Sequence, residues 1–216
     1  MALAKEQKIA EVLSSNLDNG SQVLLLARSS EKLKETSNKL PKNLSVKYES
    51  VDLSVAKTDQ LKDIVLKSLG AKKPEEFDQL VVIHNAGSVG DVSQPTTQMI
   101  DFDIWRKYYD LNVFSPAVLN GVLMNIFNNK KITKNFINIT SLCCITPFKS
   151  IGCYCTGKAA REMFFKVSAE ENPDINVLNC SPGPVETDML ATISNNVVLL
   201  AKKYKSGDHV DYYDKL

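Results

Sequence analysis

Short apolar runs that read as β-strands alternate along this chain with longer segments of helical periodicity. The strands are expected at residues 23–27, 46–50, 80–84, 136–140, 175–179 and 209–212, and the helices at residues 1–17, 30–40, 55–69, 102–127 and 153–169. Apolar strands separated by helices are typical of a parallel sheet that is covered on both faces. We therefore expect an α/β fold with a Rossmann-like, doubly wound parallel sheet, in a single domain spanning residues 1–216.

Candidate functional residues follow the carboxyl ends of five of these strands. Arg28 and Asp52 follow the first two strands, and Asn85 begins the segment after the third. Ser141 follows the fourth strand, and Gly183 comes shortly after the fifth. In a doubly wound sheet, ligands bind beyond the carboxyl ends of the strands. These residues are therefore expected to meet at one crevice.

Tyr154 and Lys158 form a Y-x-x-x-K pattern, and Ser141 lies thirteen residues before the tyrosine. Positions four apart share one face of a helix, so the ammonium would lie beside the phenol. A nearby ammonium stabilises the phenolate and lowers the phenol pKa from about 10 towards neutral pH. With the Ser141 hydroxyl holding a carbonyl oxygen, the group could donate a proton while a hydride reduces a ketone. The alternative is an ordinary amphipathic helix face.

Three further motifs accompany this spacing: H-N-A-G at residues 84–87, L-N at 111–112 and S-P-G-P-V-E-T-D-M at 181–189. Together with Ser141, Tyr154 and Lys158, they resemble the motifs of the short-chain dehydrogenase/reductase family, where the first usually reads N-N-A-G. The segments 85–93, 140–149, 154–161 and 205–215 resemble in particular those members that reduce pterins. The resemblance covers nearly the whole chain from about residue 23 onward.

The resemblance implies an NADP(H)-dependent homodimeric reductase that acts on the side-chain ketones of a pterin, in the last steps of tetrahydrobiopterin formation. Tyr154 would be the general acid, Lys158 would lower its pKa and bind the nicotinamide ribose, and Ser141 would hold the carbonyl oxygen. Asn112 would kink its helix and position a water for proton relay. Its alternative role is an ordinary polar position in a long helix. A reductase for other carbonyl compounds is a further possibility.

The cofactor and substrate residues are also implied by the resemblance. Arg28 with Ser29 suits the 2′-phosphate of NADP, because dinucleotide folds that prefer NAD keep an acidic residue there, although Arg28 could also be a plain surface residue. The expected NADP(H) contacts are Arg28, Ser29, Val51, Asp52, Asn85, Ala86, Gly87, Lys158, Val185, Glu186, Thr187, Asp188, Met189 and Leu190. The expected substrate contacts are Ser141, Leu142, Tyr154, Gly183 and Asp211, whose carboxylate would accept hydrogen bonds from the pterin.

Two features of the family pattern have no counterpart in this sequence. The glycine-rich turn T-G-x-x-x-G-x-G, which brings backbone N–H groups to the cofactor pyrophosphate, does not occur, and the first glycine is Gly20. We expect the first strand to be absent with it, and the substrate-covering region between Met189 and Lys205 to be shortened. The alternative function is therefore a truncated, non-catalytic form that binds no cofactor and pairs only with full-length subunits.

Composition excludes several other classes of protein. The formal net charge of +1 gives no electrostatic footprint for nucleic acid, and no apolar run is long enough to span a membrane. Five cysteines without a C-x-x-C spacing argue against a disulfide scaffold or a zinc site, so no metal is expected. Cys153 and Cys155 flank the catalytic tyrosine and are expected to pack, with a reactive thiol as the alternative. Reduced cysteines and the lack of a signal sequence indicate the cytosol.

Overall fold

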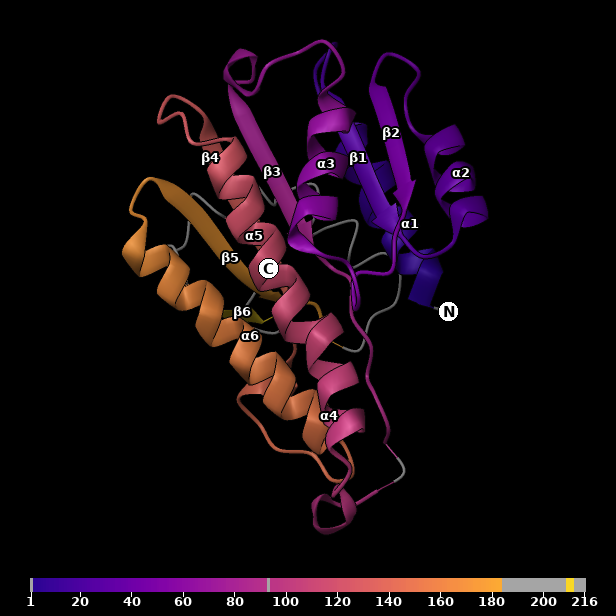
Figure 1. Ribbon diagram of the computed structural model, residues 1–216, viewed down its shortest axis with the longest axis vertical. Helices are drawn as coiled ribbons and strands as arrows, with labels where there is room; N and C mark the ends of the chain where they lie inside the picture. The colour runs from indigo at the N-terminus through magenta and orange to yellow at the C-terminus, as the bar shows by residue number, and fades with distance from the viewer. Residues whose placement is uncertain (1, 93, 184–208, 212–216) are drawn as a thin grey trace.

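The computed structural model describes residues 2–92, 94–183 and 209–211, and Figure 1 shows their arrangement. The strands run from Gln22–Ala27 (β1), Ser45–Ser50 (β2), Gln79–His84 (β3), Thr133–Ile139 (β4), Ile175–Ser181 (β5) and His209–Asp211 (β6). Every pairing between neighbouring strands is parallel. The expected α/β fold with a Rossmann-like parallel arrangement is therefore confirmed, and each strand lies within a few residues of its predicted range.

The hydrogen bonding of these strands is interrupted between β1 and β3. β1 pairs only with β2, whereas β3, β4, β5 and β6 form a separate sheet in that order. In Figure 1, β1 lies on the side of β2 that is nearer to β3. Within the described ranges, no strand pairs with the facing edges of β1 and β3. Among the described strands, the facing backbone N–H and C=O groups of β1 and β3 therefore have no sheet partners.

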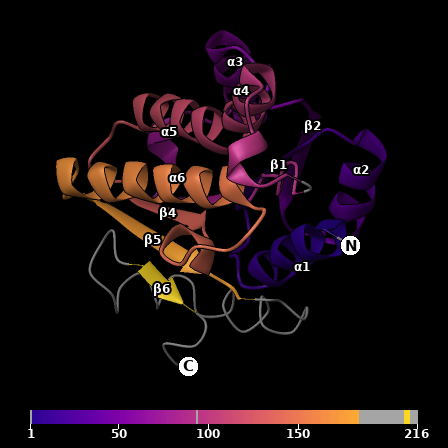
Figure 2. The same cartoon turned by 90° about the horizontal axis from the view of Figure 1, so that it is seen from below.

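Helices cover the strands on both faces (Figure 2). The longer ones span Ala2–Ser14 (α1), Ser30–Lys39 (α2), Thr58–Leu69 (α3), Phe102–Tyr109 (α4), Ser115–Ile126 (α5) and Gly152–Glu171 (α6), with short 3-10 turns at Pro74–Glu76 (η1), Thr96–Gln98 (η2) and Leu142–Cys144 (η4). The α3, α4, α5 and α6 helices lie on one face, and α1 lies on the other. No helix in the described part of the chain has the length and apolar character needed to cross a membrane.

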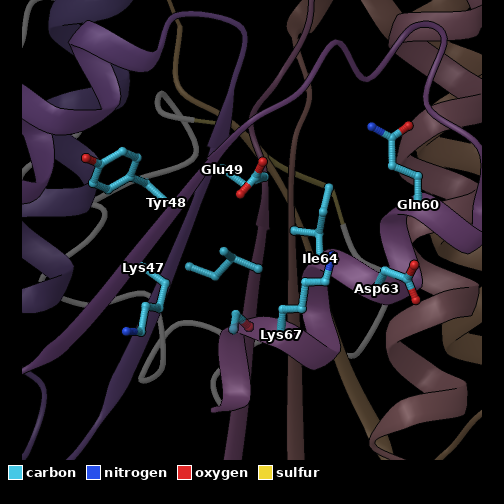
Figure 3. A pocket seen from close by; sticks show the side chains of 9 residues that line it. Lys47, Tyr48, Glu49, Gln60, Asp63, Ile64 and Lys67 are labelled. Atoms are coloured by element: carbon cyan, nitrogen blue, oxygen red, sulfur yellow. The ribbon is translucent and has the colours of Figure 1, made fainter.

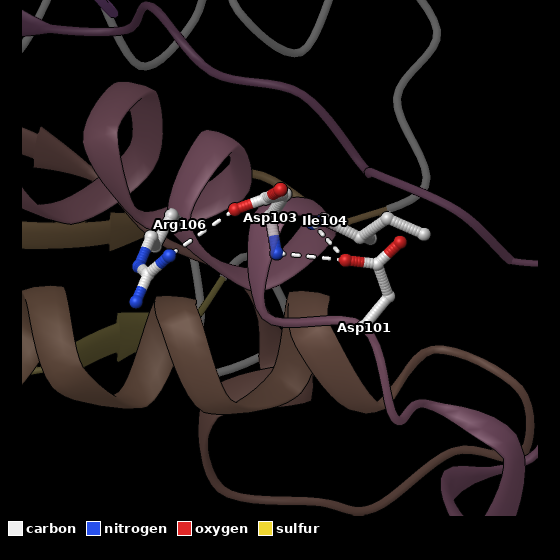
Figure 4. A network of polar contacts seen from close by, with 4 residues as sticks. All are labelled: Asp101, Asp103, Ile104 and Arg106. Carbon is white, nitrogen blue, oxygen red and sulfur yellow. Dashed lines mark hydrogen bonds and ion pairs between the residues drawn. The ribbon is translucent and has the colours of Figure 1, made fainter.

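Side-chain caps fix where two of these helices begin. The Ser29 hydroxyl accepts a hydrogen bond from the Lys32 amide and starts α2 directly after β1. Figure 4 shows the corresponding cap of α4, where the Asp101 carboxylate accepts bonds from the Asp103 and Ile104 amides at 2.8 and 3.4 Å. Because these caps satisfy amides that no helical turn can reach, they hold the loops after β1 and before α4 in place.

The prediction of one continuous helix at residues 102–127 is wrong in one respect. It is divided into α4 and α5 by a π-helical segment, Asp110–Phe114 (η3). The segment surrounds Asn112, whose side-chain amide donates to the Tyr108 carbonyl at 2.8 Å. An inserted residue of this kind is common at functional sites, and here it turns a buried asparagine towards the loop after β3.

The main core lies between the four-stranded sheet and the helices α3, α5 and α6. Its fully buried members include Phe136 of β4, Phe165 of α6 and Leu123 of α5, and Leu24 of β1 packs at its margin. A smaller cluster around Ile137 and Leu178 on the opposite face receives Leu13 of α1. Both faces of β4 and β5 are thus apolar, as a fully covered parallel sheet requires.

His84 ends β3 inside this core. Its side chain is 5% exposed, and its ring lies 4.9 Å from the ring of Phe165 and 6.4 Å from that of Phe136 between centroids. Burial, assisted by the positive charge of Arg161, lowers the pKa of His84 to about 3. The imidazole is therefore neutral in the folded chain at every pH at which the protein is expected to work.

This burial predicts a specific loss of stability in acid. A histidine with a lower pKa in the folded state takes up a proton on unfolding, so its contribution is complete above pH 6.5 and declines as the pH falls towards 3. The free energy of unfolding should drop by about 2 kcal/mol between pH 7 and pH 5 through this residue alone. Urea unfolding of the His84→Asn variant should lack that component. The His209→Asn variant, in contrast, should retain it, and equal pH dependence in the wild type and His84→Asn would contradict the assignment.

Candidate active site

Two buried polar side chains of α6, Lys158 and Glu162, form hydrogen bonds at the end of β4. The Lys158 Nζ atom donates to the Ile139 carbonyl at 2.6 Å. The Glu162 carboxylate accepts a bond from the Thr140 hydroxyl at 2.8 Å and pairs with Lys166 at 2.8 Å. These bonds hold the first half of α6 against the strand end from which Ser141 emerges, so they fix the helix face that carries the expected proton donor.

Ser141 and Tyr154 meet at this point, as the sequence predicts. Ser141 is extended and caps η4 by accepting a bond from the Cys143 amide at 3.3 Å. Its side chain also lies close enough to the Tyr154 phenol to lower the phenol pKa. Tyr154 is half-buried, and the Lys158 Nζ atom lies 5.6 Å from the centroid of its ring. Leu142, which follows Ser141 in η4, is exposed. The structure therefore brings the serine, the tyrosine and the lysine together.

The expectation that Lys158 lowers the pKa of Tyr154 is wrong for this structure. Burial raises the pKa of the Tyr154 phenol above its usual value, against opposing contributions from the Ser141 hydrogen bond and the Arg161 charge. Burial also lowers the pKa of Lys158 to about 7, and repulsion from Arg161 acts in the same direction. Burial thus favours the uncharged form of the Lys158 amine. The sequence could not reveal this, because the spacing of two residues says nothing about their desolvation.

Asn112 holds the loop that follows β3. Its Oδ1 atom accepts a bond from the Ser88 amide at 2.8 Å while its Nδ2 atom holds the Tyr108 carbonyl. A Cβ atom on Gly87 would lie only 2.8 Å from Asn112 Oδ1, so this approach requires glycine at the last position of H-N-A-G. The Asn112 side chain is thus 2% exposed and makes two hydrogen bonds, and its functional role stays a prediction.

Arg161 is a residue of this site that the sequence analysis missed. It is 1% exposed and lies three residues after Lys158 on the same helix. Its Nε atom donates to Asn138 Oδ1 at 2.6 Å, its Nη1 atom donates to the Ala86 carbonyl at 3.0 Å, and its Nη2 atom donates to the His84 carbonyl. The signal was present in the sequence, because an arginine on the helix face shared with a catalytic lysine must itself be buried.

The expected cofactor residues divide between the two sheets. Asn85 and Ala86 are half-buried and Gly87 is exposed at the end of β3, beside the residues held by Arg161 and Asn112. Arg28, Ser29, Val51 and Asp52 follow β1 and β2, on the far side of the interruption. Arg28 is exposed and Val51 is buried. Hydrogen bonds from the Ser54 hydroxyl and amide lower the pKa of Asp52, with a smaller contribution from the charge of Arg28.

The other predicted residues are only partly described. Gly183 has a φ of 68°, a left-handed conformation that suits glycine directly after β5. Asp211 is the last residue of β6 and is in register with Ser181 of β5. Val185, Glu186, Thr187, Asp188, Met189 and Leu190 lie outside the described residues.

An open hollow of about 500 Å³ lies elsewhere in the molecule, between β2 and α3 (Figure 3). Lys47 and Glu49 come from the strand, and Asp63 and Lys67 come from the helix. Charges of both signs line it, and it contains none of the expected site residues. The chemistry is therefore concentrated at the strand ends and not in this hollow.

Comparison with known proteins places these features in a family. The family model of short chain dehydrogenases matches residues 8–197. The sepiapterin reductase of Xenopus tropicalis is 33% identical to this chain, and the alignment covers 95% of the chain and 91% of the relative. The chain therefore belongs to the short-chain dehydrogenase family, a family of oxidoreductases, and sepiapterin reductases are among its homologues.

Solved structures show the same fold. A short-chain dehydrogenase/reductase from Saccharomyces cerevisiae superposes with a TM-score of 0.74 at 26% identity, covering 95% of this chain and 90% of the other. A short chain dehydrogenase from Shigella flexneri, solved in complex with NADP, has a TM-score of 0.69 at 20% identity, covering 88% and 85%. The second match supports the fold alone.

Because Asn112 makes two hydrogen bonds, we expect its substitution by alanine to reduce stability more than the same substitution at Asn125. Asn112→Ala should lower the free energy of unfolding by about 2–4 kcal/mol, because it removes the partner of the buried Tyr108 carbonyl and that of the part-buried Ser88 amide. Asn125→Ala removes a similar bond to the Gly121 carbonyl on the exposed side of α5 and should change stability by less than about 1 kcal/mol. Chemical denaturation measures both, and equal losses would contradict the role of Asn112.

Proposed function

We propose that this chain is an NADPH-dependent carbonyl reductase that acts on the side-chain ketones of a pterin. The observation that carries the proposal is the meeting of Ser141, Tyr154 and Lys158 at the end of β4, beside the loop that Asn112 and Arg161 hold. Membership of the short-chain dehydrogenase family supports an oxidoreductase, and similarity to sepiapterin reductases supports a pterin as substrate.

Each residue of the site has a task that its surroundings suit. The Ser141 hydroxyl would hold the carbonyl oxygen against the phenol, and Tyr154 would donate the proton to the forming alkoxide. A phenol whose pKa is raised by burial remains protonated at neutral pH, so it is ready as an acid. Asn112, already bonded through both of its polar atoms, would act by holding the loop after β3 in this arrangement.

The residues present fit a nicotinamide cofactor in part. NADPH supplies a hydride when it is bound. The exposed guanidinium of Arg28, next to the Ser29 cap of α2, suits the 2′-phosphate, and no ion pair within the described ranges joins Arg28 to a carboxylate. Burial lowers the pKa of Lys158 to about 7, and ribose hydroxyls of the cofactor would accept hydrogen bonds from its amine and so favour the protonated form. Membership of the short-chain dehydrogenase family supports a nicotinamide cofactor.

A second function, a non-catalytic form, is favoured by the interruption between β1 and β3. Arg28 and Asp52 follow the strands of the two-stranded sheet, whereas Ser141 follows β4 of the four-stranded sheet and Tyr154 lies on α6. No strand of the described residues joins the two groups. If the halves move independently, the proton donor is formed but the cofactor is held weakly.

Cofactor binding and turnover distinguish the two functions. Fluorescence titration of the purified chain should show saturable NADPH binding that is tighter than NADH binding, followed by NADPH oxidation when sepiapterin is added. Tyr154→Phe should reduce turnover by about 100-fold or more without weakening NADPH binding, and Tyr48→Phe, on exposed β2, should change neither. A folded chain that binds no NADPH would establish the non-catalytic alternative.

We further propose that the chain forms a homodimer through α5 and α6. Apolar side chains project from this surface at helical spacing: Phe114 (52% exposed), Val118 (39%), Met163 (59%) and Val167 (45%). Positions 114 and 118, like 163 and 167, share one helix face. A second copy would cover an apolar stripe that water otherwise contacts.

All five cysteines are free thiols, which supports a location in the cytosol.

Sedimentation tests the dimer. The wild-type chain should sediment as a dimer at micromolar concentration, and the double variant Val118→Glu with Met163→Glu should sediment as a monomer, because two carboxylates would be buried without partners. Val55→Glu, at a position that is 74% exposed in the loop before α3, should leave the dimer intact. A wild-type chain that is monomeric throughout this range would contradict the proposal.

A further inference from the structure

Within the described residues, no ion pair joins the buried guanidinium of Arg161 to a carboxylate. All three of its bonds in the described part of the chain go to neutral oxygens, on Asn138, Ala86 and His84. The adjacent Glu162 points to Thr140 and Lys166 instead. A buried cation is costly unless its hydrogen bonds are satisfied, and neutral acceptors satisfy them without cancelling the charge. The positive charge is therefore available to act on its neighbours.

We propose that Arg161 is a positioning residue of the reduction, which fixes the loop after β3 to α6 and keeps a positive charge near Tyr154 at neutral pH. The inference rests on the proposed reductase function. Three anchors on β3, on the following loop and on β4 prevent the guanidinium from moving away from the site. Because the fork of an arginine is planar and rigid, these bonds also set the distance between α6 and the loop.

Lys158 cannot perform this task in the free protein. Its ammonium is committed to the Ile139 carbonyl, and burial lowers its pKa to about 7. Burial also lowers the pKa of Arg161, but only to about 10, so the guanidinium is charged at neutral pH. Arg161 opposes the effect of burial on the Tyr154 phenol and repels the proton of Lys158. One buried cation thus biases both titrating groups of the site.

Other groups around the phenol do not supply a positive charge. The titratable or charged side chains that act on Tyr154 or contact its ring are Cys143 of η4, Cys155, Lys158 and Arg161 of α6, and Tyr108 of α4. The two thiols and Tyr108 become negative on ionisation, so they oppose the phenolate. Of the two cations, Arg161 favours the phenolate, whereas burial lowers the pKa of Lys158 to about 7 and leaves it neutral in the alkaline range where the phenol ionises.

The ionisation of Tyr154 can be measured without any turnover. Tyrosine labelled with ¹³C at the ζ carbon gives one NMR signal for each phenol, and the Tyr154 signal is identified by its loss in Tyr154→Phe. We expect Arg161→Met to raise the pKa of Tyr154 by about one pH unit, a tenfold change in the ionisation constant. Arg161→Lys retains the charge and should raise it by less than half as much. Arg106→Met removes an exposed arginine of α4 and should leave the pKa of Tyr154 unchanged.

A second comparison serves if Arg161→Met does not fold. Lys158→Met should change the pKa of Tyr154 by less than about half a pH unit, because Lys158 is already neutral where the phenol titrates. A Tyr154 pKa that rises by about one pH unit in Lys158→Met, or that stays the same in a folded Arg161→Met, would overturn the proposal. In an active enzyme, the basic limb of the pH–rate profile should move with the NMR value in Arg161→Met but not in Arg161→Lys. Absence of turnover in the wild type would refute the reductase function and leave the NMR result standing.

Discussion

The attachment of α6 to the end of β4 is the interaction on which the site depends. Lys158, Arg161 and Glu162 are all buried, and each donates to or accepts from an atom of β3, β4 or the residues directly after them. Buried polar groups are stable only when their partners are in place, so helix and strand ends must form together. The position of Tyr154 relative to Ser141 is a consequence of this network, and so is the shape of the loop after β3.

The interruption of the sheet limits what this network can achieve. The four-stranded sheet contains the core, the proton donor and the Asn112 contact, and it has hydrogen bonds on both sides of β4 and β5. The two-stranded sheet contributes Arg28 and Asp52 but is joined to the rest chiefly by packing, such as that of Leu24 at the margin of the core. The residues proposed for acid–base chemistry therefore lie at the four-stranded sheet, which has more hydrogen bonds between strands. The residues proposed to select the cofactor follow the two-stranded sheet, which has fewer.

Local patterns predicted the elements well and their electrostatics poorly. Runs such as residues 80–84 are apolar enough to be strands in any context, and the spacing of Tyr154 and Lys158 placed both on α6. The periodicity of residues 102–127 did not predict a division of this helix, and only the resemblance implied a kink at Asn112, where the structure has a π-helical segment and a contact with the Ser88 amide. The pKa values of Tyr154 and Lys158 depend on desolvation and on Arg161, and neither follows from sequence spacing.

Hydrogen exchange of individual amides tests most directly whether the four-stranded half is formed while the sheet is interrupted. The amides of β4, paired on both sides, and those of α6 should exchange slowly, together with the Ser88 amide that Asn112 holds. In β1, which pairs only with β2, alternate amides should exchange rapidly. Rapid exchange throughout β4 and α6 would contradict the account, because the site could not then exist in the free chain. Uniform protection of β1 would show that its open edge is paired after all.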